Sequence, residues 1–502
     1  MFNFFKNKNK TATKPKNTTN AHYVVVGPKN YAAAEQNRLT YSWTNYKYTS
    51  DQIIKKYYKP LVARSCEQCM NNPYMIKFLS LLENNVIGDT GIALQAQAKD
   101  PSGQLDTIAN DAHEAAWKKW QKKKNCDVTN KLNFIGMCKL AIKTVAREGE
   151  CLIHIVTGKE AGPWGFALQL IDPRQLDVDK NEDNLADGHF IRFGIEFNKY
   201  GKPLKYFLKT REDGYYQQIG QPYNEVKAEN LIHLFIPQYI NQKRGLPWLS
   251  GILMRSNMLN GFEEAAVEHA RVGACQMGFI TSNDPDEYED EDDEDETIIQ
   301  AAPASFHKLP PGYDVKKFDP AYPNGEFDAF SKSILRSISA GLNVGYADLT
   351  GDLTQVNFSS LRHGVIDTRE VWKGLQEWFK SSFVEEVHEA WLKYSLLAGK
   401  ISCGSGYLKP ERIDKYREVT WTMRRWQWVD PVKDVNSAAI SVANGFRSRS
   451  NVIREQGYDP DEVWAEIEKE NATLRQKDIL VKNEVVRDVG DEDNEEQTTT
   501  KI

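Results

Sequence analysis

The chain has 502 residues, of which 40% are hydrophobic and 27% are charged, a composition typical of a water-soluble protein with enough sequence for about three domains. No stretch approaches the roughly 18 consecutive apolar residues that a membrane span requires, and the N-terminal MFNFFKNKNKTATKPK lacks the apolar core and cleavage site of a secretory signal. We therefore expect a chain that is made in the cytosol, has no membrane partner, and begins with a basic disordered tail.

The net charge of −6 conceals two acidic segments. Residues 284–296, DPDEYEDEDDEDE, contain eleven acidic residues and no base, and residues 488–496 contain six more. The rest of the chain has 64 basic against 53 acidic residues, an excess of +11. Because like charges repel one another, we expect both segments to be disordered. The first is either a solubilising loop or a segment that binds a basic partner, and it lacks the glycine spacing of a calcium loop.

Helical patterns come first along the chain. Asn71, Asn72 and Pro73 predict the start of a helix, which has an apolar stripe at Ile76, Leu79, Leu82 and Val86. A second helix is predicted over residues 106–124, with one face formed by Ile108, Ala112, Ala116 and Trp120. A third helix is predicted over residues 132–148.

The period then changes to that of strands, which are predicted at residues 151–156, 166–172, 190–198, 204–209 and 231–237. In residues 190–198 the apolar residues Ile191, Phe193, Ile195 and Phe197 alternate with others, which predicts one strand with one buried face. NKYGKP, which follows it, predicts a hairpin turn. The first half of the chain is therefore predicted to be α+β.

Helical spacing returns from Pro247 to about Gly278, with an apolar stripe that includes Ile252, Leu259 and Phe262. After the acidic run and a Pro/Gly-rich segment, a shorter helix is predicted over residues 327–344. A polar stretch without lysine, ADLTGDLTQVNFSSLR, leads into a long helix from Ser359 to Leu397, whose predicted buried side is formed by Leu361, Val365, Trp372, Leu375, Phe379, Phe383 and Val387. Near the C-terminus, Asp459, Pro460 and Glu462 predict a capped helix.

The motifs of common catalytic sites are missing from the sequence. It contains no phosphate-binding loop, no H-E-x-x-H and no nucleophile elbow. Cys66 and Cys69 form one C-x-x-C without the second pair of a zinc site. His154 and His233 lie in strand patterns and are interpreted as packing residues. We therefore predict no enzyme activity, no metal and no cofactor.

Several stretches together resemble the lambda-type family of tailed-bacteriophage portal proteins. They are NNPYMIKFLSLLENNVIGDTGI, AREGECLIHIV, RGLPWLSGILMRSNMLNGFEEAAVEHARVGACQMGFI, YADLTGDLTQVNFSSLRHGV and GFRSRSNVIREQGYDPDEVWAEIEKE, which follow one another in the family's order between about residues 35 and 470. The acidic run at 284–296 is a departure from the family's pattern.

The resemblance implies an α+β portal-protein fold with an α/β wing, antiparallel stem helices, a small clip, a channel (tunnel) loop and an α-helical crown. Its expected boundaries are a basic tail at 1–30, wing at 31–248, stem helix 1 at 249–278, clip at 279–327, stem helix 2 at 328–345, channel loop at 346–358, wing again at 359–433, crown at 434–485 and an acidic tail at 486–502.

The resemblance also implies a function and partners. The expected protein is a homododecameric ring at the portal vertex of the capsid, assembled in the host cytoplasm, through which double-stranded DNA is packaged and ejected. The expected partners are the large terminase, neck or head-completion proteins, and capsid and scaffold proteins. Docking candidates for the motor or neck are Asp290, Asp292, Asp293 and Asp295, in the acidic run.

Residues 346–361 contain no lysine or arginine, and this suits a loop past which DNA slides, because each lysine–phosphate contact adds to non-specific affinity. The candidate channel residues are Asp348, Thr350, Gly351, Asp352, Thr354, Gln355 and Asn357. An ordinary surface turn has the same composition. The alternative functions are another virion structural protein, such as a neck or head-completion protein, and a DNA-packaging enzyme.

Overall fold

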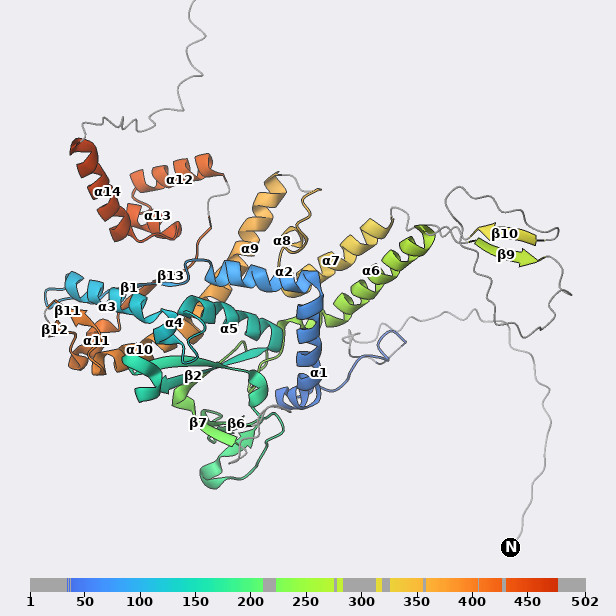
Figure 1. Cartoon of the computed structure of the whole chain (residues 1–502), viewed down its shortest axis with the longest axis horizontal. Helices are drawn as coiled ribbons and strands as arrows, with labels where there is room; N and C mark the ends of the chain where they lie inside the picture. The colour runs from blue at the N-terminus through green and yellow to red at the C-terminus, as the bar shows by residue number, and fades with distance from the viewer. Residues whose placement is uncertain are drawn as a thin grey trace, which may run out of the picture. The chain divides into compact units, whose positions relative to one another are not determined.

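The computed structural model describes residues 34, 36, 38–210, 223–274, 278–282, 313–317, 326–354, 358–404, 406–426 and 430–476. The chain divides into two compact units, Met1–Thr49 and Ser50–Ile502. In the first, the described residues 38–49 form turns, with Tyr46 and Tyr48 in an edge-to-face contact at 5.3 Å between ring centroids. All helices and strands named below belong to the second unit (Figure 1).

The first half of this unit begins with helices α1 (Ser50–Asn71), α2 (Pro73–Leu82, continued by a π-helical turn, Glu83–Ile87), α3 (Thr107–Trp120), α4 (Lys123–Cys126) and α5 (Phe134–Glu148). The predicted helix start at Pro73 is confirmed. The Asn72 side chain accepts hydrogen bonds from the amides of Tyr74 and Met75, as an N-cap does.

Two predicted helix faces are partly wrong. On α2, Leu79 and Leu82 are buried, but Ile76 is 48% exposed. On α3, Ile108 is 66% exposed. The buried residues of α3 are Ala109, Asn110, His113, Ala116, Trp117 and Trp120. A spacing of three and four residues fits several neighbouring stripes on one helix, and the position of the partner elements decides which stripe is covered.

A three-stranded antiparallel sheet in the order β3-β2-β8 lies beneath α5 (Figure 1). Its strands are β2 (Glu150–Thr157), β3 (Phe166–Ile171) and β8 (Leu231–Phe235), which confirms the predicted strands at 151–156, 166–172 and 231–237. Leu152 pairs with Ile171 on one side of β2 and with His233 on the other. A second sheet has the order β4-β5-β6-β7, with strands β4 (Phe190–Arg192), β5 (Ile195–Phe197), β6 (Pro203–Lys209) and β7 (Tyr223–Lys227).

The prediction of one strand over residues 190–198 is wrong. This stretch is a tight hairpin, in which Arg192 pairs with Ile195 and the turn residues Phe193 and Gly194 have φ values of 52° and 80°. Two positive φ angles in a two-residue turn reverse the chain. Phe193 is nevertheless buried, at 2% exposure. The apolar alternation therefore predicted the burial of Phe193 correctly but did not show that the chain reverses direction there. The turn predicted at NKYGKP is confirmed, because it joins β5 to β6.

The second half starts with α6 (Leu253–Ala274), which is followed by strands β9 (Gly278–Ser282) and β10 (Tyr313–Lys317), and then by α7 (Glu326–Leu342), α8 (Tyr346–Thr350) and α9 (Phe358–Phe379). The predicted first long helix does not include Gly278, since Gly278 begins a strand that pairs antiparallel with β10. The acidic run, including Asp290, Asp292, Asp293 and Asp295, lies outside the described residues, as do both predicted tails.

The long helix predicted from Ser359 to Leu397 is confirmed. It consists of α9, a π-helical turn (Lys380–Val384) and α10 (Glu385–Leu397). Its buried aromatic residues meet those of α3 and α5 in the main core. For example, the Trp391 ring lies 4.9 Å from the ring of Trp117, and both side chains are almost completely buried.

Short elements follow, namely β11 (Ser402–Cys403), β12 (Gly406–Tyr407), α11 (Ile413–Tyr416) and β13 (Val419–Thr422). Strand β13 pairs with β1 (Ala93–Ala96), a strand that the sequence pattern did not indicate. The C-terminal helices are α12 (Pro431–Ala443), α13 (Arg449–Glu455) and α14 (Pro460–Gln476). Among the described helices, none is long and apolar enough to cross a membrane.

Candidate channel segment

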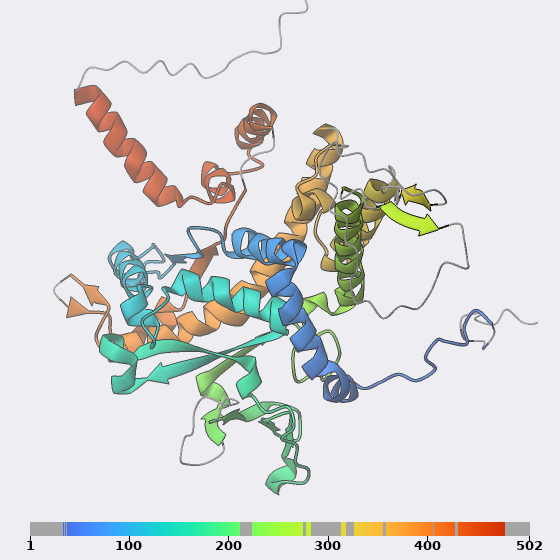
Figure 2. The ribbon, with the colours of Figure 1, turned by 45° about the vertical axis from the view of Figure 1, so that its right-hand side comes forward.

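Helices α6 and α7 form an antiparallel pair, and they lie side by side in both views (Figures 1 and 2). Near the beginning of α7, Phe327 and Phe330 contact Phe262, with ring centroids 5.3 and 5.0 Å away. Near its end, Gly341 approaches Ile252 so closely that a β carbon there would lie 2.3 Å from the Ile252 side chain. The pair is thus packed along its length, and glycine is needed at the closer end.

A polar network attaches α6 to α1 and α2. The Asn72 amide donates to Ser256 at 3.0 Å and to Asn260 at 2.8 Å, and the Ser256 hydroxyl donates to Gln68 at 2.8 Å. Asn72 and Ser256 are completely buried. One residue therefore caps α2 and holds α6 at the same time, which fixes the base of the helical pair to the rest of the unit.

The segment after α7 begins with a helix and not with a loop. The first five residues of the predicted loop 346–358 form α8, in which Leu349 is buried against the core. Gly351 ends α8 with a φ of 75°, a left-handed conformation suited to glycine. The described part of the loop is therefore residues 351–354, while Gln355 and Asn357 lie outside the described residues.

The polar side chains of this segment bond mainly to one another. Asp352 accepts hydrogen bonds from the Thr354 hydroxyl at 2.6 Å and from the Tyr346 hydroxyl at 3.0 Å. The Thr350 hydroxyl donates to the carbonyl of Tyr346 at 2.8 Å. The ammonium group of Lys332 lies 3.5 Å from Asp352. Sequence reasoning missed Tyr346 and Lys332, because only the fold brings α7 beside this loop.

The two acidic residues of the segment differ in environment. Hydrogen bonds from Thr354 and Tyr346, together with Lys332, hold the pKa of Asp352 well below its ordinary value, so this carboxylate is charged at neutral pH. Burial raises the pKa of Asp348, and Lys77 opposes that rise. Leu353 is 56% exposed and Thr354 is exposed. The segment therefore presents one tethered carboxylate and a short, uncharged tip.

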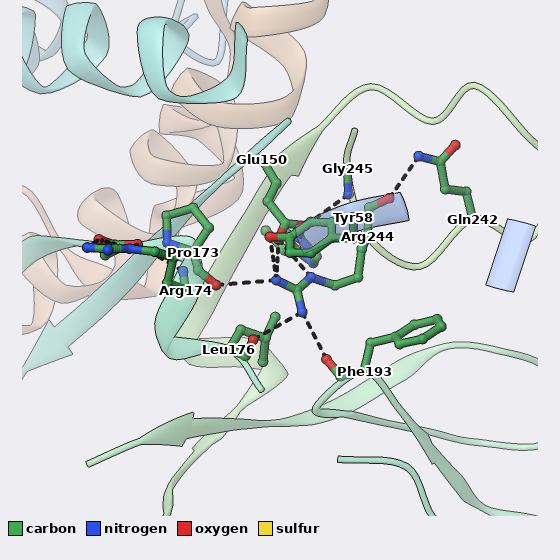
Figure 3. A network of polar contacts seen from close by, with 11 residues as sticks. Tyr58, Glu150, Pro173, Arg174, Leu176, Phe193, Gln242, Arg244 and Gly245 are labelled. Carbon is green, nitrogen blue, oxygen red and sulfur yellow. Dashed lines mark hydrogen bonds and ion pairs between the residues drawn. The ribbon is translucent and has the colours of Figure 1, made fainter. Parts of the chain in front are cut away.

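A buried ion pair lies between β2 of the first sheet and the β4–β5 turn of the second (Figure 3). Both Glu150 and Arg244 have 0% side-chain exposure. The Arg244 guanidinium donates to Glu150, to the Tyr58 hydroxyl at 2.9 Å, and to three backbone carbonyls, those of Pro173, Leu176 and Phe193. Every side of the guanidinium is thus occupied by a partner from another element.

The carboxylate of this pair is equally well satisfied. Glu150 also bonds to His233 at 2.9 Å and accepts from the amide of Gly245 at 2.9 Å. Burial alone would raise the pKa of Glu150, but Arg244 and His233 outweigh burial and hold it well below its ordinary value. The pair is enclosed, and its polar groups are occupied by protein partners, so its role is structural. We call Glu150 and Arg244 the clasp. His233, which the sequence pattern suggested only as a packing residue, is thus a hydrogen-bond partner of Glu150.

A second buried polar pair consists of His113 and His388, whose Nε2 atoms lie 3.0 Å apart among tryptophan rings. Burial lowers the pKa of His113 to about 4, and burial with the neighbouring His113 lowers that of His388 to about 3. Both imidazoles are therefore neutral at pH 7. Burial also raises the pKa of the Cys66 and Cys69 thiols. Within the described ranges no group of three or more histidine, cysteine or acidic side chains is arranged to hold a metal ion.

Comparison with known proteins gives consistent matches. The family model described as phage portal protein, lambda family, matches residues 36–376. The chain is 33% identical over 452 residues to the probable portal protein of Halomonas phage phiHAP-1, which covers 88% of this chain and 86% of that protein. It is 21% identical to portal protein B of Escherichia phage lambda, over 82% of this chain and 83% of that protein. A solved structure, the neck of a native GTA particle computed with C12 symmetry, contains a chain that is 12% identical, with a TM-score of 0.43, covering 81% of this chain and 94% of that one.

Proposed function

Because the chain belongs to the lambda family of phage portal proteins, we propose that identical copies close into a ring at one vertex of the capsid, and that double-stranded DNA is packaged and ejected through the bore. The observation that carries this proposal is the family match, which extends over residues 36–376 and includes α6, α7, α8 and the loop after it. The expected ring is a dodecamer, assembled in the host cytoplasm and then part of the virion.

The parts of the ring follow the chain order. We assign α6 and α7 to the stem, β9 and β10 with the residues between them to the clip, and α12, α13 and α14 to the crown. The remaining helices and sheets, with the Glu150–Arg244 clasp, form the wing. The antiparallel packing of α6 against α7 supports the stem assignment, and the attachment of α6 to Asn72 joins the stem firmly to the wing.

We assign residues 351–357 to the channel loop, with α8 as its support. A ring repeats each residue around the bore, so one cationic side chain per subunit would become a collar of positive charge. DNA phosphates would bind such a collar and slow translocation. The tethering of Asp352 to Tyr346 and Thr354 supports this assignment, because it keeps the one charge of the described loop negative and close to the protein.

Electron microscopy of the purified chain tests the ring. We expect ring-shaped particles with a central hole wide enough for duplex DNA. A chain that stays monomeric under every assembly condition, or particles without a hole, would contradict the proposal. Measurable ATPase activity of the pure chain would instead favour a packaging enzyme, and particles of another shape would favour a different virion structural protein.

The channel loop is tested by charge. The triple variant Leu353→Lys, Thr354→Lys and Gln355→Lys should assemble normally but package DNA more slowly, because each lysine adds phosphate contacts. The same three positions with uncharged side chains (Leu353→Gln, Thr354→Gln and Gln355→Asn) are the control and should package at nearly the original rate. Equal packaging rates for the lysine variant and the control variant would contradict the assignment of this loop to the channel.

The terminase, neck, capsid and scaffold proteins remain proposed partners. We propose that the acidic run, with Asp290, Asp292, Asp293 and Asp295, attracts a basic docking protein. Such attraction should weaken steeply with salt. A variant without residues 284–296 should therefore bind the motor more weakly at low salt and equally at high salt. An unchanged affinity at both concentrations would make the run a solubilising segment.

A further inference from the structure

Six lysines gather where α3 ends and α4 begins. Lys118 and Lys119 lie in the last turn of α3. Lys122 directly precedes α4, Lys123 and Lys124 are its first two residues, and Lys131 lies in the turn that leads to α5. All six are exposed. We call this surface the lysine ridge.

The ridge has few compensating carboxylates. Lys118 is the exception, because it is paired with Glu462 at 2.9 Å, and Glu114 and Asp459 also lie near enough to help raise its pKa. In the part of the chain that the structure describes, the other five lysines have no carboxylate within ion-pair distance. Asp127, in the same turn, is 5% exposed, and it accepts four hydrogen bonds from Thr129, Lys131 and Leu132. An exposed Glu160 lies on the 3₁₀ segment that contacts α4, but Lys159 is its neighbour.

The backbone beneath the ridge is held by the core. Trp120 is 0% exposed and its indole N–H donates to the carbonyl of Phe166 at 3.1 Å. The side-chain amide of Asn125 donates to the backbone carbonyl of Lys119 at 2.7 Å, and the backbone N–H of Phe134 donates to the backbone carbonyl of Gln121 at 3.0 Å. The backbone that carries the lysines is therefore fixed, so the lysines stay close together although their charges repel one another.

Local helix electrostatics explains only part of this arrangement. Cations in the last turn of a helix interact favourably with its dipole, and this accounts for Lys118 and Lys119 on α3. Lys122, Lys123 and Lys124 open a helix of one turn and Lys131 lies in a turn, so the dipole of α3 does not account for these four. A fixed surface with a large excess of one charge instead attracts a polyanion.

We propose that the lysine ridge binds the phosphate backbone of double-stranded DNA outside the channel. The inference rests on the proposed function, in which this chain handles duplex DNA. Flexible lysines act as point charges that suit repeated phosphates in any sequence. The only aromatic side chain between residues 118 and 131 is the buried Trp120, so the ridge offers no platform on which single-stranded bases would stack. The ridge has the opposite chemistry to the channel loop, which suits holding DNA and not sliding past it.

The test compares two triple variants of the full chain, Lys122→Gln, Lys123→Gln and Lys124→Gln on the ridge, and Lys199→Gln, Lys202→Gln and Lys409→Gln elsewhere. The control lysines are exposed, and no carboxylate of the described residues lies within ion-pair distance of them. Binding of a short fluorescent duplex is measured by anisotropy as salt rises from 50 to 200 mM. Three lost phosphate contacts should flatten the slope of log affinity against log salt by about 2.7, so that the variant loses about 40-fold less affinity over this range than the original chain. The control should keep the original slope.

Equal slopes for the two variants would overturn the proposal. It would also be overturned if a peptide of residues 488–496 bound the ridge and the duplex did not, because the ridge would then serve an acidic segment of protein. Particle imaging of each variant keeps this result separate from the proposed function. Rings that form normally and lose only the salt-dependent binding support the ridge, whereas failure of the original chain to form rings would count against the portal assignment itself.

Discussion

Replacing Arg244 with methionine should destabilise the fold severely. Methionine fills similar space but leaves the fully buried Glu150 carboxylate without its cation, and it removes the donors to three backbone carbonyls. Removing one partner of a buried ion pair costs about 3–5 kcal/mol. Denaturant unfolding followed by tryptophan fluorescence should show this loss in the free energy of unfolding.

Arg174→Met is the matched control. Arg174 pairs with Asp172 nearby in the same region (Figure 3), but its side chain is 74% exposed, and exposed pairs contribute about 0–1 kcal/mol. The double variant Glu150→Gln with Arg244→Met should recover part of the loss, because no buried charge is then left unpaired. If Arg244→Met were no more harmful than Arg174→Met, the clasp would not hold the two sheets together.

The same variant should also change the response to acid. In the original chain the pKa of Glu150 is lowered in the folded state, so its contribution to stability is present above the unfolded pKa of about 4.3 and is lost as the pH falls through the lower, folded value. Without Arg244, burial would raise the pKa of Glu150. The destabilisation by Arg244→Met should therefore shrink as the pH falls from 7 towards 5. A penalty independent of pH would contradict this account.

Three further predictions concern the core. The pKa values of His113 and His388, about 4 and about 3, lie below the unfolded value, so the unfolded chain binds more protons than the folded chain below about pH 6.5. The free energy of unfolding should therefore fall by up to about 2.7 kcal/mol per pH unit between about pH 6 and 4. His388→Gln should reduce this slope by about half in unfolding experiments, and an unchanged slope would refute the prediction. Trp372→Ala should cost about 3–5 kcal/mol because the side chain is 3% exposed, and an unchanged melting temperature would contradict this. Gly149→Ala should lower the free energy of unfolding by more than about 1–2 kcal/mol, since φ is 96° and a β carbon would lie 2.5 Å from a backbone carbon. Gly158→Ala is the control, because with φ of 85° and no atom within 4 Å it measures the backbone strain without the clash. Equal losses in melting temperature for the two variants would show that the clash at Gly149 is harmless.

Local patterns predicted most of the regular elements. Asn72 and Pro73 mark a helix start by their own chemistry, and the spacing of Trp372, Phe379 and Phe383 predicts the long helix by itself. Such signals depend on residues within one or two turns of each other. The family resemblance, which is spread over most of the chain, is likewise a property of the sequence.

The candidate channel segment was predicted only in part. Its lack of lysine and the turn at Gly351 are visible in the sequence, whereas α8 and the bonds of Asp352 to Tyr346 and Lys332 are not. Five residues form too short a helix to show a period, and Lys332 reaches the loop only because α7 packs there.

The linear sequence thus determined the type and order of most elements and the family, since both depend on residue types at short or fixed spacing. Tertiary structure alone decided which stripe of each helix is buried, and it decided that residues 190–198 turn back on themselves. There the carbonyl of Phe193 accepts from Arg244, and its amide donates to Asn181. It also decided that Glu150 meets a cation 94 positions away. Such contacts depend on how distant segments pack, and no spacing within a single segment encodes them.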